Sequence, residues 1–250
     1  MNWIAYEHYA YAALAVAGTL LAVIGVEVLA HHPRVAPWLK RFEGVVPPFI
    51  NVNAMLFGLT LAFIANDTWS ARDRAMDAVF READSLRSLL VLSEALPEPL
   101  AGALAQEVRG YGQAAAAEFD ALRTRDTESE TSVAADRLLR LVAAPEAMIG
   151  DAVHGQLLSK VMKLRDDRDL RVSLSRTHLN PLKWLGMAAL GFLTILSIAA
   201  VHLGNFRAGM LAIVLFALAA APSSAIVLVQ GNPFQSPAAI SAEPILDAIR

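Results

Sequence analysis

Residues 49–69 read FINVNAMLFGLTLAFIANDTW, a stretch apolar enough to lie in lipid that also contains Asn51, Asn53, Asn66 and Asp67. A helix crosses the hydrocarbon core of a bilayer, about 30 Å thick, in about 20 residues. Three other stretches of this length and character occur in the chain. Together with residues 46–66, they predict four membrane spans, the other three being residues 11–30, 184–203 and 208–229.

The composition of the whole chain also indicates a membrane protein. Of 250 residues, 56% are hydrophobic and 18% are charged, with a mean hydropathy of +0.44, whereas soluble domains average about 45–50% apolar and about 25% charged residues. The chain has no cysteine, which excludes disulfides and thiolate metal sites. The net charge of −3 gives no electrostatic reason to expect a nucleic acid as a partner. The first span follows a segment without Lys or Arg, so we expect it to be retained and not cleaved as a signal peptide.

The polar middle of the chain, residues 67–181, predicts a helical domain outside the membrane. Residues 124–132 predict a loop, in which Ser132 caps the next helix, and Pro145 predicts the start of a last long helix. No alternating strand pattern occurs. Earlier in the domain, apolar residues recur at intervals of three and four, which is typical of one buried helix face: Met76, Val79, Ala83, Leu86 and Leu90.

We therefore expect an all-α membrane protein with four transmembrane helices in two pairs. Residues 1–66 form the first pair and residues 182–229 the second, with the helical domain of residues 67–181 inserted between them. Residues 230–250 are rich in turn-forming residues and predict an extended C-terminal arm. Its apolar side chains suggest contact with a neighbouring subunit: Phe234, Ile240, Ile245 and Leu246.

The second span is predicted to continue as one helix into the helical domain, because no Gly or Pro interrupts residues 59–96. Heptad steps along this helix define two rows. A straight helix drifts by about 20° per heptad from such a row, so the full rows hold only if the helices supercoil. The polar row is Asn53, Thr60, Asp67, Arg74 and Arg81, and the apolar row, a predicted packing seam, is Ala62, Trp69, Met76, Ala83 and Leu90.

Four motifs resemble the bestrophin-like domain family, a bacterial and plastid membrane family of unknown function that is distantly similar to bestrophin anion channels. They are FGLTLAFIANDTW (57–69), READSLRSLLVLSEALP (81–97), NPLKWLGMAALGFLTILSIAAVHL (180–203) and AIVLVQGNPFQSP (225–237). The resemblance implies a multi-pass protein of a cell membrane, here a bacterial inner membrane, that forms a homo-oligomer, by analogy a pentamer. It also implies that the second span lines a narrow apolar neck. The acidic calcium clasp of animal bestrophins has no counterpart here, so calcium gating is not expected.

These observations predict an ion pathway lined by the second span. Amide and hydroxyl groups would replace part of an ion's hydration, and aromatic rings would form a constriction that gates by dewetting. The plainer alternative is that the polar groups form hydrogen bonds between helices and that the rings simply pack. Arg74 and the family favour anions, while Asp67 favours cations. The predicted lining is Asn53, Phe57, Thr60 and Phe63, with Asp67 and Arg74 at the mouth on the side of the helical domain.

Other residues indicate less about function. Glu27 lies three residues from the end of the first span, and we expect its side chain to reach the membrane interface. No catalytic, phosphate-binding or metal-binding spacing occurs, so neither an enzyme nor a cofactor is expected. The alternative function is a non-conducting membrane scaffold or sensor whose helical domain binds a protein partner. Basic residues flank the spans at both membrane faces, so the side on which the helical domain lies stays open.

Overall fold

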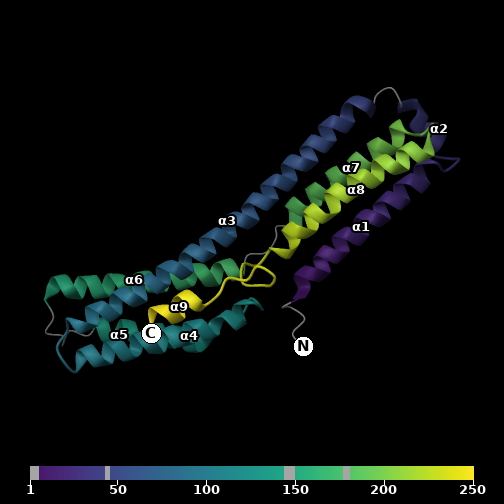
Figure 1. The fold of residues 1–250 in the computed structure, drawn as a ribbon. Coiled ribbons are helices and arrows are strands. Elements are labelled where there is room, and N and C mark those ends of the chain that lie inside the picture. Colours follow the sequence, from purple (N-terminus) through teal and green to yellow (C-terminus); the bar gives the residue numbers. More distant parts are fainter. Residues whose placement is uncertain (1–5, 43–45, 144–149, 177–180) are drawn as a thin grey trace. The chain divides into compact units, whose positions relative to one another are not determined.

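The computed structural model describes residues 6–42, 46–143, 150–176 and 181–250. The protein is 84% helical, and the described residues contain no strand, which confirms the all-α prediction. Figure 1 shows the helices in chain order. They are α1 (Glu7–Ala30), α2 (Ala36–Leu39), the 3₁₀ turn η2 (Lys40–Phe42), α3 (Val46–Glu94), α4 (Leu100–Leu122), α5 (Ser129–Ala143), α6 (Asp151–Ser175), α7 (Pro181–Val201), α8 (Phe206–Val229) and α9 (Glu243–Ala248).

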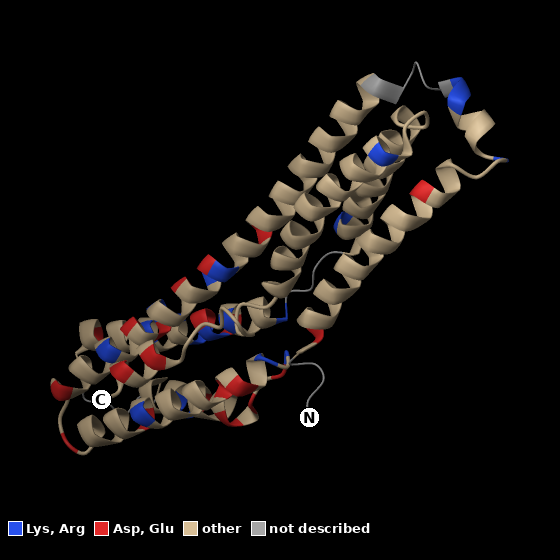
Figure 2. Ribbon diagram, turned by 45° about the vertical axis from the view of Figure 1, so that its right-hand side comes forward, with Lys and Arg blue, Asp and Glu red and all other residues tan. Residues whose placement is uncertain are grey.

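Four of these helices, α1, α3, α7 and α8, are long and apolar enough to cross a membrane. They coincide with the four predicted spans, because length and apolar composition are properties that the local sequence already carries. In Figure 2 the charged residues gather on α4, α5, α6 and the later part of α3, while long segments of the four apolar helices carry none.

The contacts between helices divide the chain into two compact units. The span unit contains residues 6–69 and 178–231, and the helical unit contains residues 70–177 and 232–250. Helix α3 is common to both and passes from one to the other after Trp69. Its 49 residues correspond to about 74 Å of helix, which confirms the prediction of one continuous helix.

In the span unit, α1 packs against α8 and α7. Val23, Val26 and Ala30 of α1 lie in one buried cluster with Ala199 of α7 and Ile213 of α8. Alanines in such a cluster let helix backbones approach closely, which favours packing where no hydrophobic effect drives helices together within lipid.

The core of the helical unit is formed by α3, α4, α5 and α6. Val79, Ala83 and Leu86 of α3 are buried there, as the three-and-four spacing predicts, and Leu90 is partly buried. Met76 is 39% exposed, so it lies at the edge of this face. Within one chain the predicted heptad seam is exposed over Ala62, Trp69 and Met76, as expected where a heptad row drifts around a straight helix.

Two predicted helix boundaries lie in this unit. Helix α5 begins at Ser129, so Ser132 lies inside it and the prediction that Ser132 caps the helix is wrong. The first turn can start earlier because Ser129 and Glu130 are themselves acceptable at a helix N-terminus. Pro145 lies outside the described residues, and α6 is described from Asp151.

The C-terminal segment, residues 232–250, is not an extended arm. It includes the short helix α9, and both Phe234 and Ile245 are buried in the core of its own helical unit. The side chains of Asn232 and Gln235 donate hydrogen bonds to the carbonyls of Leu122 (3.0 Å) and Arg123 (2.8 Å). These carbonyls lie at the end of α4, where a helix lacks internal donors, so the segment caps α4.

Gly112 of α4 lies against Ile249 of this segment, and the contact gives a stability test. A Cβ at Gly112 would lie 2.6 Å from Cγ2 of Ile249, so Gly112→Ala should cost about 1–3 kcal/mol through overpacking, offset in part by better helix propensity. Gly110→Ala on the same helix meets nothing within 4 Å and should stabilise by about 0.5–1 kcal/mol. Thermal unfolding of both variants would show whether their changes in stability have opposite signs. A similar gain in stability in both would show that Ile249 moves aside at no energetic cost, which would contradict the prediction.

Candidate functional site

The predicted polar row of α3 mostly pairs with neighbouring helices of the same chain. In the span unit, Asn53 Nδ2 donates to Ser197 Oγ of α7 at 3.2 Å, and Asp67 forms an ion pair with Lys183 of α7. In the helical unit, Arg81 Nε lies 2.8 Å from Asp167 Oδ1 of α6. For Asn53, the plainer alternative of an interhelical hydrogen bond is therefore the one that the structure contains.

The two predicted constriction residues lie on different sides of α3. Phe57 is 8% exposed and points toward α7, where Cε2 of its ring would lie 3.2 Å from a Cβ placed on Gly191. Its ring centroid is also 5.4 Å from that of Phe216 on α8. Phe63, in contrast, is 62% exposed. Within one chain these two rings do not face a common space.

The last two residues of the predicted set differ in setting. Thr60 is half-buried in the span unit. Arg74 is exposed in the helical unit, and its Nε donates to the carbonyl oxygen of Ser70 one turn earlier at 3.2 Å. A pore around an axis needs several copies, so the lining role of the whole set stays a prediction.

The side of α3 that the chain leaves uncovered is displaced by one residue from the predicted row. It contains Val52 (51% exposed), Leu59 (50% exposed), Asn66 and Asp73, again spaced seven apart. We call these four residues the outer row. The polar residues of the Asn53 row suggested that this row lines the pathway. Polar side chains also turn toward partners within a helix bundle, so polarity alone does not identify the side of α3 that the chain leaves uncovered.

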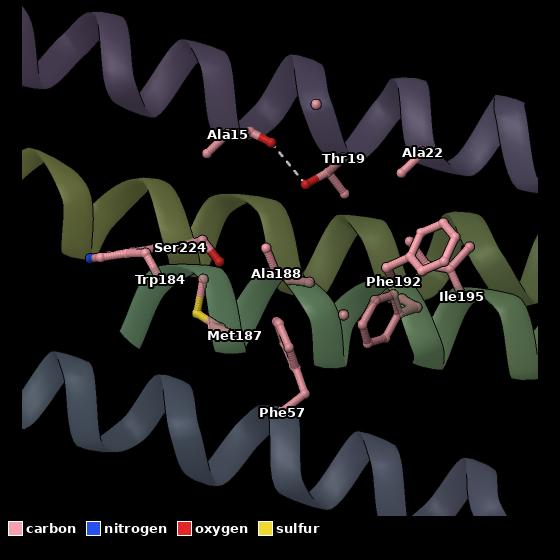
Figure 3. A pocket seen from close by; sticks show the side chains of 14 residues that line it. Ala15, Thr19, Ala22, Phe57, Trp184, Met187, Ala188, Phe192, Ile195 and Ser224 are labelled. Atoms are coloured by element: carbon pink, nitrogen blue, oxygen red, sulfur yellow. Dashed lines mark hydrogen bonds between the residues drawn. The ribbon is translucent and has the colours of Figure 1, made fainter. Parts of the chain in front are cut away.

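A cavity of about 340 Å³ lies within the span unit, next to Phe57 (Figure 3). None of the described residues that line it has an ionisable side chain. Figure 3 shows Thr19 of α1 turned back onto its own helix, where its hydroxyl donates to the carbonyl of Ala15 at 2.8 Å. The cavity is suited to apolar groups and not to ions. Its lining is Ala15, Gly18, Thr19 and Ala22 of α1, Phe57 of α3, Trp184, Met187, Ala188, Gly191, Phe192 and Ile195 of α7, and Phe216, Ala220 and Ser224 of α8.

The helical unit contains a buried network of charges. Arg171 of α6 is fully buried; its Nε lies 2.8 Å from Glu82 Oε2 of α3 and its Nη2 lies 3.1 Å from Glu118 Oε2 of α4. Arg168 also pairs with Glu118, and the hydroxyl of Tyr111 donates to Glu82 Oε1 at 2.6 Å. The network therefore joins three helices through hydrogen-bonded ion pairs.

Burial and charge act together on two groups of this network. Burial disfavours the charged form of Arg171, but the negative charges of Glu82 and Glu118 outweigh it, so the pKa of the guanidinium is raised. The pKa of the Tyr111 phenol is raised well above its ordinary value, first by burial and then by the Glu82 carboxylate. Arg171 therefore stays charged and Tyr111 neutral, which suits a structural network better than a proton-transfer site.

The sequence carries a signal for this network. Glu82 lies three residues after Val79 and four before Leu86, and Glu118 lies between Ala115 and Phe119, so both carboxylates occupy apolar helix faces. A charged residue on such a face is rarely buried without a partner. Within the described residues, no group of three or more His, Cys, Asp or Glu is arranged to hold a metal ion.

Comparison with known proteins identifies the family. The profile of the Bestrophin-like domain family matches residues 14–245, nearly the whole chain. No curated protein and no solved structure matches the chain. The match includes all the motifs on which the resemblance rested, as well as the four apolar helices of the span unit. This membrane protein belongs to the Bestrophin-like domain family.

Proposed function

We propose that several copies of this protein form an ion channel, in which α3 of each copy lines a common pathway. In each copy, α1 and α3 would be the first two spans along the chain and α7 and α8 the last two, and the family suggests five copies in a bacterial inner membrane. The observation that carries the proposal is the uncovered side of α3. That helix buries 17% of its most apolar segment, the smallest share of the four described spans, against 22% for α1, 44% for α7 and 39% for α8.

The uncovered side has the order of groups that an apolar neck requires. Leu59 and Phe63 are both at least half exposed, and Asn66 follows about one turn later with an exposed carboxamide. Copies of Leu59 and Phe63 around an axis would form a dry constriction, and such constrictions gate by dewetting. The Asn66 amides would then lie in water at its end, which satisfies their hydrogen bonds.

The sign of the ion depends on the charges that follow the constriction along α3. Asp67 was the main reason to expect cations, but its charge is balanced by Lys183 in the same chain. Asp73 and Arg74, about two turns later, are both exposed. The guanidinium of Arg74, together with the family, supports anions, while Asp73 supplies the opposing charge.

Charge substitutions at these two positions test the sign. In a salt gradient, Arg74→Glu should move the reversal potential of the current away from the value for chloride and toward the value for the cation. The reason is that the substitution replaces a charge that attracts anions by one that repels them. Asp73→Asn should move it the other way. Planar-bilayer recordings of the purified protein would measure both shifts; no shift in either variant would place the selectivity elsewhere in the chain.

Ion flux into liposomes is the experiment that decides the function, and native mass spectrometry in detergent gives the number of copies. Conduction by an oligomer is expected. A monomer without flux, together with a protein cross-linked to the surface of α4, α5 and α6, would instead support a membrane scaffold or sensor.

A further inference from the structure

Glu27 is completely buried in the span unit, near the end of α1. Its residue exposure is 0%, and neither carboxyl oxygen has a hydrogen-bond partner among the described residues. The prediction that this side chain reaches the membrane interface is therefore wrong. The side chain lies between helices instead, so the packing of α1 on its neighbours prevents it from extending toward water.

Three chain segments meet at this carboxyl group. His31, one turn later on the same segment, has Nδ1 3.6 Å from Glu27 Oε1. His202 lies just after the end of α7, and Gly209 lies in the second turn of α8. A Cβ at Gly209 would be 3.3 Å from Glu27 Oε1 and 3.0 Å from Cβ of His202. Because Gly209 has no side chain, the carboxyl group of Glu27 and the side chain of His202 can both occupy the space next to it.

The titratable groups that act on Glu27 are two imidazoles. His31 comes from its own chain segment and His202 from the end of α7, while α8 faces it with Gly209. Phe206 packs against His31, with ring centroids 5.2 Å apart in an edge-to-face arrangement. The permanent positive charges of the adjoining segments are exposed to solvent, and they are Arg34 before α2, Lys40 and Arg41 of η2, and Arg207 of α8.

We propose that Glu27, His31 and His202 form a proton-binding site that joins the end of α1 to the turn between α7 and α8. A buried carboxylate without hydrogen bonds or a charged partner is strongly unfavourable. One proton bound on the carboxyl group removes this cost, because a carboxylic acid carries no charge.

The site makes the packing of α1 depend on pH. In the unfolded chain both imidazoles bind protons below about pH 6.5 and the Glu side chain is ionised above about pH 4.3, whereas the folded site binds one proton. The unfolded chain therefore binds more protons than the folded site below about pH 6.5 and fewer above it, so stability rises toward neutral pH and falls again at higher pH as the site loses its proton. Loss of the proton leaves a bare carboxylate that loosens α1 from α7 and α8.

Infrared spectroscopy of the purified protein in lipid tests the site without requiring conduction. The difference spectrum between about pH 5 and about pH 8 should contain the carbonyl band of a protonated carboxyl that disappears on alkalinisation. Glu27→Gln should remove this band, and Glu94→Gln, at an exposed carboxylate of α3, should leave it. If the band survives Glu27→Gln, or is absent from the wild type, the site does not bind a proton and the proposal is wrong.

Histidine variants provide a second measurement, which also applies if Glu27→Gln does not fold. His31→Gln and His202→Gln should shift the pH at which the band disappears, because each removes an imidazole that faces the carboxyl group. His32→Gln changes the adjacent, exposed histidine and should cause no shift. Equal behaviour of His31→Gln, His202→Gln and His32→Gln would overturn the assignment of the imidazoles. A protein that conducts no ions would still give the predicted spectra, so failure of the channel proposal can be distinguished from failure of the proton-site proposal.

Discussion

Replacing Arg171 by alanine should destabilise the helical unit by about 3–5 kcal/mol, because the change leaves buried carboxylates without their main partner. Arg171 is fully buried, and its guanidinium contacts both Glu82 and Glu118. It also lies over the ring of Phe119, with its Cζ 4.8 Å from the ring centroid. Thermal unfolding, and hydrogen exchange of the amides of α4 and α6 followed by mass spectrometry, would measure the loss.

The same helix offers a matched control. Arg165 of α6 pairs with Asp136 at 3.2 Å, but both side chains are at least a third exposed, so Arg165→Ala should cost less than about 1 kcal/mol. The double variant Glu82→Gln with Arg171→Met removes one charge of each sign and should recover much of the loss. Equal effects of Arg171→Ala and Arg165→Ala would contradict the prediction, and so would a double variant as unstable as Arg171→Ala.

The helices and spans could be predicted because they depend on local sequence. Four apolar segments of sufficient length, and the absence of Gly or Pro after Gly58, are enough to predict the spans and the long helix α3. The packing of the C-terminal segment, in contrast, depends on groups more than 100 residues away in sequence. Phe234 packs edge-to-face against Phe119, and Ile249 lies over Gly112. Proline-rich composition predicts turns, but it does not indicate whether another part of the chain offers a surface on which those turns pack.

The candidate sites were harder to predict for a related reason. A helical repeat places residues on one face, but the direction of that face depends on which neighbours pack against it. Asn53 turns to Ser197, and Asp67 turns to Lys183, both on a helix more than 100 residues away in sequence. Glu27 depends similarly on the space left by Gly209. In each case the residue type was informative, and the partner that gives it a role came from the tertiary packing.

Phe57 and Phe63 lie six residues apart on α3 and were both predicted to line the pathway with Asn53, but only Phe63 lies on the uncovered side of the helix. Phe63→Ala should raise ion flux severalfold with little change in stability, because Phe63 is 62% exposed and its removal would widen a dry constriction. Phe57→Ala should instead cost about 3–5 kcal/mol, because it leaves a cavity against Gly191 and Phe216. Liposome flux and thermal unfolding of both variants would measure these effects. If Phe57→Ala raises flux at unchanged stability while Phe63→Ala does not, the row that contains Asn53 faces the ions, and the outer row faces lipid.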